Sequence, residues 1–239
     1  MITLNAEPEA ISLERARSAL VIVDMQNAFL RPEGYFGMLG VDLEEVPSVI
    51  DRCRRLADAC RRSSIQIIYL KMVYPGETER SKIVNTPLFY KSKTFRLAKD
   101  QPDILKRLPL EGSWGIDIID ELTPHSEDLV IVKERHDGFV GTNFQIHLSQ
   151  KRIKSLIFAG TATNVCVEST LRHAAALDYF ATLVADATSP LGSHELHEAT
   201  ISNVKASFGW VTDTQSVLAA LQYPDQSPTG SDFPEATLL

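Results

Sequence analysis

Short runs of consecutive apolar residues recur along the chain, and most are followed by a segment with helical periodicity. The main runs cover residues 19–23 (A-L-V-I-V), 65–73, 129–132, 156–159 and 180–185. A run without polar alternation is typical of a strand buried on both faces, as in a parallel sheet. The alternation therefore predicts an α/β fold: a single-domain three-layer sandwich with a mainly parallel central sheet covered by helices on both faces.

The segments between these runs supply the expected helices. From Val46 to Cys60, apolar residues repeat at intervals of three and four, which leaves several arginines on a face that we expect to be solvated. Further helices are expected over residues 116–122, 142–151, 165–177, 193–206 and 214–221, with a last strand over residues 208–212. Residues 25–45 combine glycines with aromatic residues, a composition that predicts an ordered loop lining a pocket.

The 239 residues suffice for one domain, which we expect over residues 1–221, followed by a mobile tail over residues 222–239. The net charge of -7 argues against binding to nucleic acid or to an anionic membrane, since both require a basic face. Three cysteines without a repeated spacing indicate a reducing compartment. With no secretory signal and no apolar run of membrane-spanning length, we expect a cytoplasmic protein.

Cys166 is the first candidate for a catalytic residue. It follows a buried strand that ends at Gly160, and Thr163 or Asn164 is suited to cap the helix that begins there. In the first turn of that helix, the positive end of the dipole would favour the thiolate and lower the pKa of the thiol. An unpaired cysteine is more often a small core residue, so partners elsewhere in the chain must decide between the two interpretations.

Two polar residues stand where other strands of the predicted sheet end. Asp24 follows the first strand and Lys133 follows the third. Each has an ordinary structural explanation by itself, a turn cap for the aspartate and emergence into solvent for the lysine. Because parallel strands open their carboxyl ends at one edge of the sheet, we expect Asp24, Lys133 and Cys166 to gather there.

These three residue types suit a nucleophilic hydrolysis. Asp24 would take the thiol proton of Cys166 and later deliver it to a leaving amine, while Lys133 would hold the carboxylate and stabilise the thiolate. The backbone amides of Ala162 and Cys166 would face the developing oxyanion. His194 and His197 have a spacing compatible with metal ligands, but no third ligand is apparent, so we predict neither a metal nor another cofactor.

The segments around these residues resemble a known family, the isochorismatase-like cysteine hydrolases. They read V-I-V-D-M-Q-N-A-F around Asp24, V-I-V-K at Lys133 and A-G-T-A-T-N-V-C-V-E-S-T around Cys166. The resemblance implies a catalytic Asp-Lys-Cys triad at these positions. It also implies a cis peptide bond between Thr161 and Ala162 that aims the amides of Ala162 and Cys166 at the oxyanion.

Within this family the chain is most similar to the ureidoacrylate amidohydrolases of pyrimidine breakdown. The segments T-N-V-C-V-E-S-T-L-R, G-S-W-G-I-D-I-I-D-E-L and F-G-W-V-T-D carry this similarity. It implies an amidohydrolase that cleaves a C–N bond of a small linear ureido or carbamoyl compound through a thioester on the cysteine. We predict the following substrate contacts: Gln26, Tyr35, Lys71, Tyr74, Lys91 and His136.

Other functions stay open on the sequence alone. A different small substrate, such as biuret, a carbamoyl amino acid or isochorismate, would fit the same fold. A non-catalytic or redox-sensing protein that keeps the fold is the alternative from another class. The expected partners are a small-molecule substrate and further copies of the same chain, as a dimer or tetramer, without nucleic acid or membrane.

Overall fold

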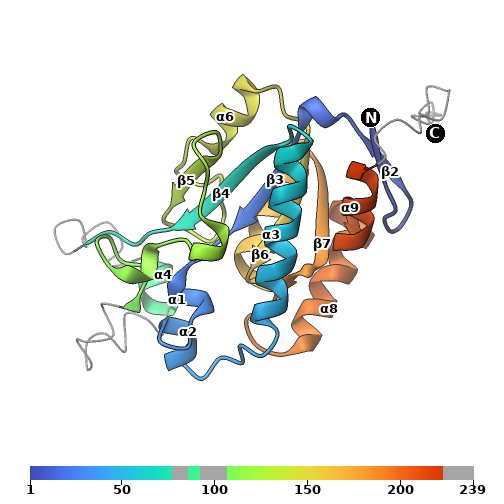
Figure 1. The fold of residues 1–239 in the computed structure, drawn as a ribbon. Coiled ribbons are helices and arrows are strands. Elements are labelled where there is room, and N and C mark those ends of the chain that lie inside the picture. Colours follow the sequence, from blue (N-terminus) through green and yellow to red (C-terminus); the bar gives the residue numbers. More distant parts are fainter. Residues whose placement is uncertain (77–85, 92–106, 223–239) are drawn as a thin grey trace.

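The computed structural model describes residues 1–76, 86–91 and 107–222, and within them the chain forms one α/β domain (Figure 1). Its central sheet has six strands in the order β5-β4-β3-β6-β7-β8, and all neighbours pair in parallel. This confirms the predicted fold class. Of the tail expected over residues 222–239, all but Gln222 lies outside the described residues.

The elements follow the predicted alternation closely. The strands are β1 (Ile2–Leu4), β2 (Ile11–Leu13), β3 (Ser18–Val23), β4 (Gln66–Met72), β5 (Leu129–Lys133), β6 (Ser155–Thr161), β7 (Phe180–Ser189) and β8 (Trp210–Thr212). The helices are α1 (Asn27–Leu30), α2 (Tyr35–Met38), α3 (Val46–Arg62), α4 (Pro87–Lys91), α6 (Phe144–Gln150), α7 (Glu168–Ala176), α8 (His194–Asn203) and α9 (Thr214–Gln222). No helix within the described ranges is both long and apolar enough to cross a bilayer.

The core lies on the two central strands. Every residue of β3 and of β6 is buried, as expected for strands covered on both faces. Helix α3 packs on β3, β4, β6 and β7 and lies beside α9 across the front of the sheet in Figure 1. Its apolar face carries Cys53 and Cys60, both fully buried, which confirms their assignment to the core.

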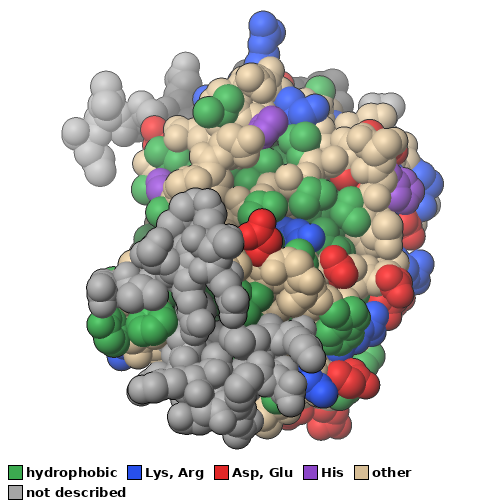
Figure 2. Space-filling model, turned by 90° about the vertical axis from the view of Figure 1, so that its left-hand side faces the viewer, with side chains coloured by type: hydrophobic (Ala, Val, Ile, Leu, Met, Phe, Trp, Pro, Cys, Tyr) green, Lys and Arg blue, Asp and Glu red, His purple; other side chains and the backbone are tan. Residues whose placement is uncertain are grey.

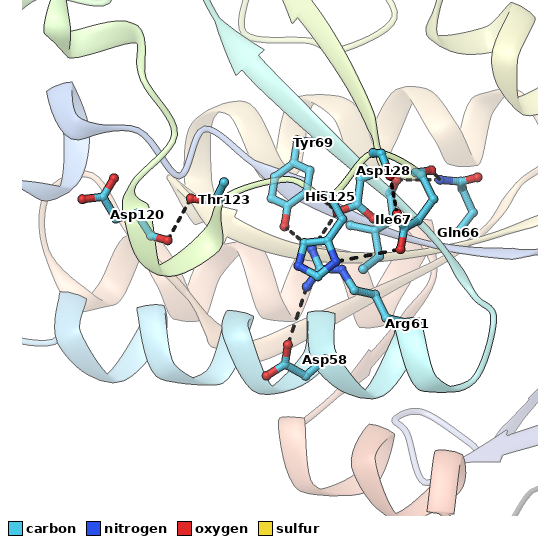
Figure 3. Close-up of polar contacts among 11 residues, drawn as sticks. Asp58, Arg61, Gln66, Ile67, Tyr69, Asp120, Thr123, His125 and Asp128 are labelled. Carbon is cyan, nitrogen blue, oxygen red and sulfur yellow. Dashed lines mark hydrogen bonds and ion pairs between the residues drawn. The ribbon is translucent and has the colours of Figure 1, made fainter.

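One arginine of α3 is not part of a solvated face. Arg61 donates a hydrogen bond to Asp128 at 2.6 Å and another to the Tyr69 hydroxyl at 3.2 Å, and it pairs with Asp58 (Figure 3). Asp128 also accepts a hydrogen bond from the backbone amide of His125 and lies directly before β5. This cluster ties the start of β5 to α3 and β4, and thereby fixes the strand that carries Lys133.

The helix expected over residues 116–122 does not form. Two 3-10 turns, Trp114–Ile116 and Asp120–Leu122, stand there with extended backbone between them. The reason is a long-range pairing: Ile118 bridges Gln26, and the amide of Ile119 donates to the carbonyl of Met25. Those bonds take the backbone groups that a helix would have needed.

Two further predictions need correction at the edges of the fold. The amino terminus, where the sequence predicted no strand, forms the antiparallel hairpin β1–β2, whose strands are too short for a clear periodic signal. Strand β5 is buried on only one face: Val130 is 43% exposed and Val132 is 52% exposed. It is the edge strand of the sheet, and the side of the molecule that carries β5 shows hydrophobic side chains among charged ones (Figure 2).

Candidate active site

Asp24 leaves the carboxyl end of β3 in a strained but fixed conformation. Its φ of 51° lies in the left-handed region, which aspartate tolerates better than most residues. The backbone is held there because the Asp24 amide donates to the Leu70 carbonyl and the Asp24 carbonyl accepts from the Gln26 amide. The side chain is 2% exposed and turns toward the edge of the sheet where β5 also ends.

Lys133, the last residue of β5, meets this carboxylate. Its Nζ lies 2.7 Å from Asp24 Oδ2 and also donates to the carbonyl of Arg135 at 3.3 Å. Burial works against charge on the amine, but Asp24 and Cys166 outweigh it and raise the pKa of Lys133 above its ordinary value. The amine is therefore a fixed cation, which makes this a buried ion pair.

The other oxygen of the same carboxylate has no fixed partner. Asp24 Oδ1 is buried and accepts no hydrogen bond from any residue in the described part of the chain. A buried acceptor without a donor is costly to keep, and such groups are candidates for catalytic roles. It is available to accept a proton from a neighbouring group.

Cys166 is that neighbour, although the backbone around it differs from the expected helix start. Residues Thr163–Val167 form a π-helical turn that precedes α7, and neither Thr163 nor Asn164 caps it with its side chain. Instead Thr163 Oγ1 bonds His197 Nδ1 at 3.0 Å, and the Asn164 amide bonds both backbone groups of Leu191. These contacts position the turn from the segment around α8, which local sequence patterns do not reveal.

The prediction of a lowered thiol pKa was wrong. Burial, which disfavours the thiolate, raises the pKa of Cys166 above its ordinary value, and the carboxylate of Asp24 raises it further. The Lys133 cation acts in the opposite direction without overcoming these two effects. The resting sulfur is therefore a thiol, and it would need a base in order to act as a nucleophile.

The turn before Cys166 requires glycine at one position. Gly160 has a φ of 112°, and a Cβ there would lie 2.2 Å from the carbonyl oxygen of Val23. Only glycine lets β6 approach the end of β3 this closely, which brings Cys166 near Asp24. The peptide bond between Thr161 and Ala162 is cis, as the resemblance implied, and both Ala162 and Cys166 line the cavity described next.

A cavity of about 680 Å³ opens beside Asp24 and Cys166, large enough for a small organic substrate. Of the predicted contacts, Tyr35, Tyr74, Lys91 and His136 line it. The loop expected to line a pocket does so, with Phe29, Phe36, Leu39, Gly40, Val41 and Asp42 in its wall. Residues Leu88, Val165, Leu191 and Gly192 were not predicted as lining residues, because they are ordinary apolar or turn residues in sequence.

Two predicted substrate contacts are placed elsewhere. Gln26 is fully buried, and its amide is taken up by the amide and carbonyl of Met72 and the carbonyl of Ile116. Lys71 lies within β4 but is absent from the cavity wall. Gln26 is therefore a structural link between the loop after Asp24 and the end of β4, and neither residue is in position to bind substrate.

His136 lines the cavity beside the sulfur of Cys166. Its Nδ1 lies 3.5 Å from Cys166 Sγ, while its ring keeps an exposed face. Burial of part of the ring and the nearby cations of Lys133 and Arg135 lower the pKa of His136, which leaves it neutral near pH 7. In the sequence, His136 is notable only because it follows Lys133 by three residues, so its contact with the thiol of Cys166 was not predicted.

The two histidines with metal-like spacing do not form a ligand set. His197 is buried against Thr163, and His194 is exposed and pairs with Glu198. Across residues 1–76, 86–91 and 107–222, no group of three or more His, Cys, Asp or Glu side chains is arranged to hold a metal ion. The polar groups that lie together at these strand ends are a thiol, a carboxylate, an ammonium group and an imidazole.

Comparison with known proteins gives a consistent result. The family model "Isochorismatase domain" matches residues 18–216. Ureidoacrylate amidohydrolase RutB of Acinetobacter baylyi is 39% identical over 223 residues, which cover 93% of this chain and 91% of that protein. The protein of the same name from Methylobacterium radiotolerans is 35% identical over 232 residues, which cover 97% of this chain and 90% of the relative.

The fold also matches solved structures. A cysteine hydrolase from Pseudomonas syringae pv. phaseolicola superimposes with a TM-score of 0.71 over 88% of this chain and 94% of the other. Its sequence is 23% identical, so this match supports the fold alone.

Proposed function

This chain belongs to the isochorismatase family and is an amidohydrolase, and we propose that it hydrolyses a C–N bond of a small linear ureido or carbamoyl compound similar to ureidoacrylate. The names of the two curated relatives support this class of substrate. We further propose that Cys166 is the nucleophile, Asp24 the proton carrier and Lys133 the cation that holds Asp24.

One observation carries the catalytic part of the proposal. A buried thiol faces a carboxylate whose Oδ2 is fixed by Lys133 at 2.7 Å and whose Oδ1 has no donor among the described residues. A purely structural ion pair would satisfy both oxygens. Here one oxygen is left without a donor, beside a substrate-sized cavity that Asp24 and Cys166 both line.

The proposed reaction begins with acylation. Cys166 Sγ attacks the ureido carbonyl carbon while its proton passes to Asp24 Oδ1. The amides of Ala162 and Cys166 stabilise the oxyanion of the tetrahedral intermediate. Its collapse breaks the C–N bond, and the amine leaves with the proton from Asp24. The carbamoyl group stays on Sγ as a thioester, which water hydrolyses to carbamate, and carbamate decomposes to carbon dioxide and ammonia.

A substrate panel tests this assignment. Steady-state kinetics with ureidoacrylate, a carbamoyl amino acid, biuret and isochorismate are expected to give the highest kcat/KM for ureidoacrylate. A clear preference for biuret or a carbamoyl amino acid would keep the reaction and change the substrate. Turnover of isochorismate alone would contradict the amide chemistry, and absence of turnover with all four would favour a non-catalytic protein.

Lys91 is expected to bind the carboxylate of the substrate. Among the described residues that line the cavity, it is the only lysine or arginine. We predict that Lys91→Met raises KM for ureidoacrylate by about 10-fold to 100-fold, the loss expected for one charge-assisted hydrogen bond. KM for biuret, which has no carboxylate, should change little. An equal rise in KM for both substrates would contradict this role.

Replacement of Asp24 separates thiolate formation from catalysis. Because the Asp24 carboxylate raises the pKa of Cys166 and Lys133 lowers it, Asp24→Asn should lower the thiol pKa. Alkylation of Cys166 by iodoacetamide at pH 7 should therefore become faster than in the wild type, while kcat falls by about 100-fold or more for want of the proton carrier. Slower alkylation, or unchanged turnover, would contradict the role of Asp24.

We also propose that the enzyme is located in the cytoplasm and takes part in pyrimidine breakdown. We propose in addition that it acts as a homo-oligomer, either a dimer or a tetramer. The three cysteines are unpaired, which supports a reducing compartment. The exposed valines of the edge strand β5, Val130 and Val132, support association through this side of the molecule (Figure 2). Sedimentation velocity of the wild type and of Val132→Lys tests the assembly: a wild type that sediments as a monomer would contradict it.

A further inference from the structure

The second half of the reaction needs a proton for the sulfur. When water hydrolyses the carbamoyl thioester, Sγ leaves as a thiolate. Burial and Asp24 raise the pKa of Cys166, so the resting enzyme holds a neutral thiol, and each turnover must return a proton to the sulfur. The attacking water must lose a proton in the same step. A single group beside Sγ that faces the water would serve both needs.

Asp24 is far less open to solvent than the ring of His136. Its side chain lines the cavity together with Cys166 but is only 2% exposed, Oδ2 is held by Lys133, and Oδ1 is buried. It lies where it can exchange a proton with the sulfur and with a leaving amine that is already bound. A water molecule that enters from solvent approaches from the side of the cavity.

His136 stands on that side. The ring has an exposed face in the cavity wall, and its Nδ1 is 3.5 Å from Sγ. Burial, Lys133 and Arg135 lower the pKa of His136, while Asp24 acts to raise it, so the ring is neutral near pH 7. With hydrogen on Nε2, the Nδ1 atom can accept a proton. Once Sγ is acylated it has no proton to share, and Nδ1 is left facing the acyl group.

We propose that His136 is a further catalytic residue, which serves the hydrolysis of acylated Cys166 by carrying the proton of the attacking water to Sγ. The inference rests on the proposed function. In this step the water oxygen bonds to the carbonyl carbon and its proton passes to Nδ1. The C–S bond then breaks with its electron pair on Sγ, and the imidazolium returns the proton to Sγ. Asp24 serves acylation and His136 serves deacylation, and both begin the next cycle unchanged.

The experiment compares the two half-reactions in His136→Ala and His136→Gln. Glutamine keeps a hydrogen-bonding group but cannot carry the proton. With a ureido substrate that the wild type turns over, rapid-quench analysis of the released amine measures acylation, and steady-state carbamate release measures turnover. The rate constant of acylation is expected to change by less than about threefold. The value of kcat is expected to fall by about 100-fold, which is within the usual range for loss of a general base. Intact-mass analysis should then show carbamoylated enzyme at steady state in both variants.

Chemical rescue distinguishes proton transfer from packing. Because the His136 ring borders the cavity, added imidazole should raise kcat of His136→Ala at least severalfold, with a rate that follows the unprotonated fraction of imidazole. The control is His194→Ala, which alters an exposed histidine on α8 and should leave kcat and its response to imidazole as in the wild type. The wild type tests the proposed function itself. If the wild type hydrolyses no ureido substrate, the proposed function is contradicted, whatever the variants do.

With an active wild type, three results would overturn the role of His136 alone. The first is a rate of acylation that falls in parallel with kcat. The second is the absence of a carbamoyl adduct in the intact-mass spectra of the variants. The third is a kcat of His136→Ala that does not rise when imidazole is added. A variant that raises KM and leaves kcat intact would make His136 a substrate contact and would also overturn the proposal.

Discussion

Turnover of a ureido substrate by Cys166→Ala is expected to fall by about 10⁴-fold or more, the scale seen when the nucleophile of a covalent mechanism is removed. The physical reason is that alanine leaves no atom to form the acyl intermediate, while the cavity and the Asp24–Lys133 pair stay in place. The measurements are kcat at saturating substrate and kcat/KM at limiting substrate, with circular dichroism as a check on folding.

Cys53→Ala provides a matched control. Cys53 is a fully buried cysteine on α3 whose thiol donates to the carbonyl of Ala187, and burial raises its pKa to about 12. The same chemical change there should lower stability by about 1 to 2 kcal/mol, since it leaves a small cavity. Its kcat should stay within about twofold of the wild type. Comparable losses of turnover in both variants would point to core packing instead of chemistry at Cys166.

Lys133→Met is expected to have the largest effect on stability. It removes one partner of a buried ion pair and leaves the Asp24 carboxylate without its counter-charge, which costs about 3 to 5 kcal/mol. Turnover should also fall by at least about 100-fold, because the carboxylate loses the cation that holds Oδ2. Urea unfolding and steady-state kinetics on the same preparation measure both effects.

The double variant Asp24→Asn/Lys133→Met separates the two effects. With both charges removed, the desolvation penalty disappears, and the free energy of unfolding should recover most of the loss caused by Lys133→Met. Turnover should not recover. Lys71→Met is the control, since this lysine lies on β4 outside the cavity wall and should tolerate the change with near-normal kcat. If the double variant is as unstable as Lys133→Met, then Lys133 does not stabilise the protein through its ion pair with Asp24.

The meeting of Asp24 and Lys133 was accessible from sequence because it follows from topology. Each residue ends a parallel strand, and the carboxyl ends of such strands open at the same edge of the sheet. This expectation needed no side-chain detail, only the alternation of buried runs and helices. Their catalytic roles with Cys166 stay predictions that the variants above test.

Other parts of the site depend on contacts between distant segments, which local patterns do not encode. Gln26 was predicted to bind substrate, but Met72 and Ile116 use all of its amide. Thr163 and Asn164 look like helix caps in sequence, yet His197 and Leu191 engage their side chains from beyond β7. In both cases tertiary hydrogen bonds replaced the local ones that sequence propensities describe.

The thiol pKa illustrates a different limit. A cysteine at the start of a helix is expected to ionise easily, because the helix dipole is a local property that the sequence suggests. Burial of Cys166 and the neighbouring Asp24 carboxylate act in the opposite direction and prevail. Neither was available before the fold was known. The outcome bears on the proposed mechanism, since a neutral thiol would need Asp24 as a base.

The central claim is that Asp24 and Cys166 act as one catalytic unit, and a double-mutant cycle on kcat/KM tests it most directly. Asp24→Asn, Cys166→Ala and the combined variant are compared with the wild type on the same ureido substrate. If the two residues serve one step, the combined loss should match that of the worse single variant. Losses that multiply, as for independent residues, would contradict the account.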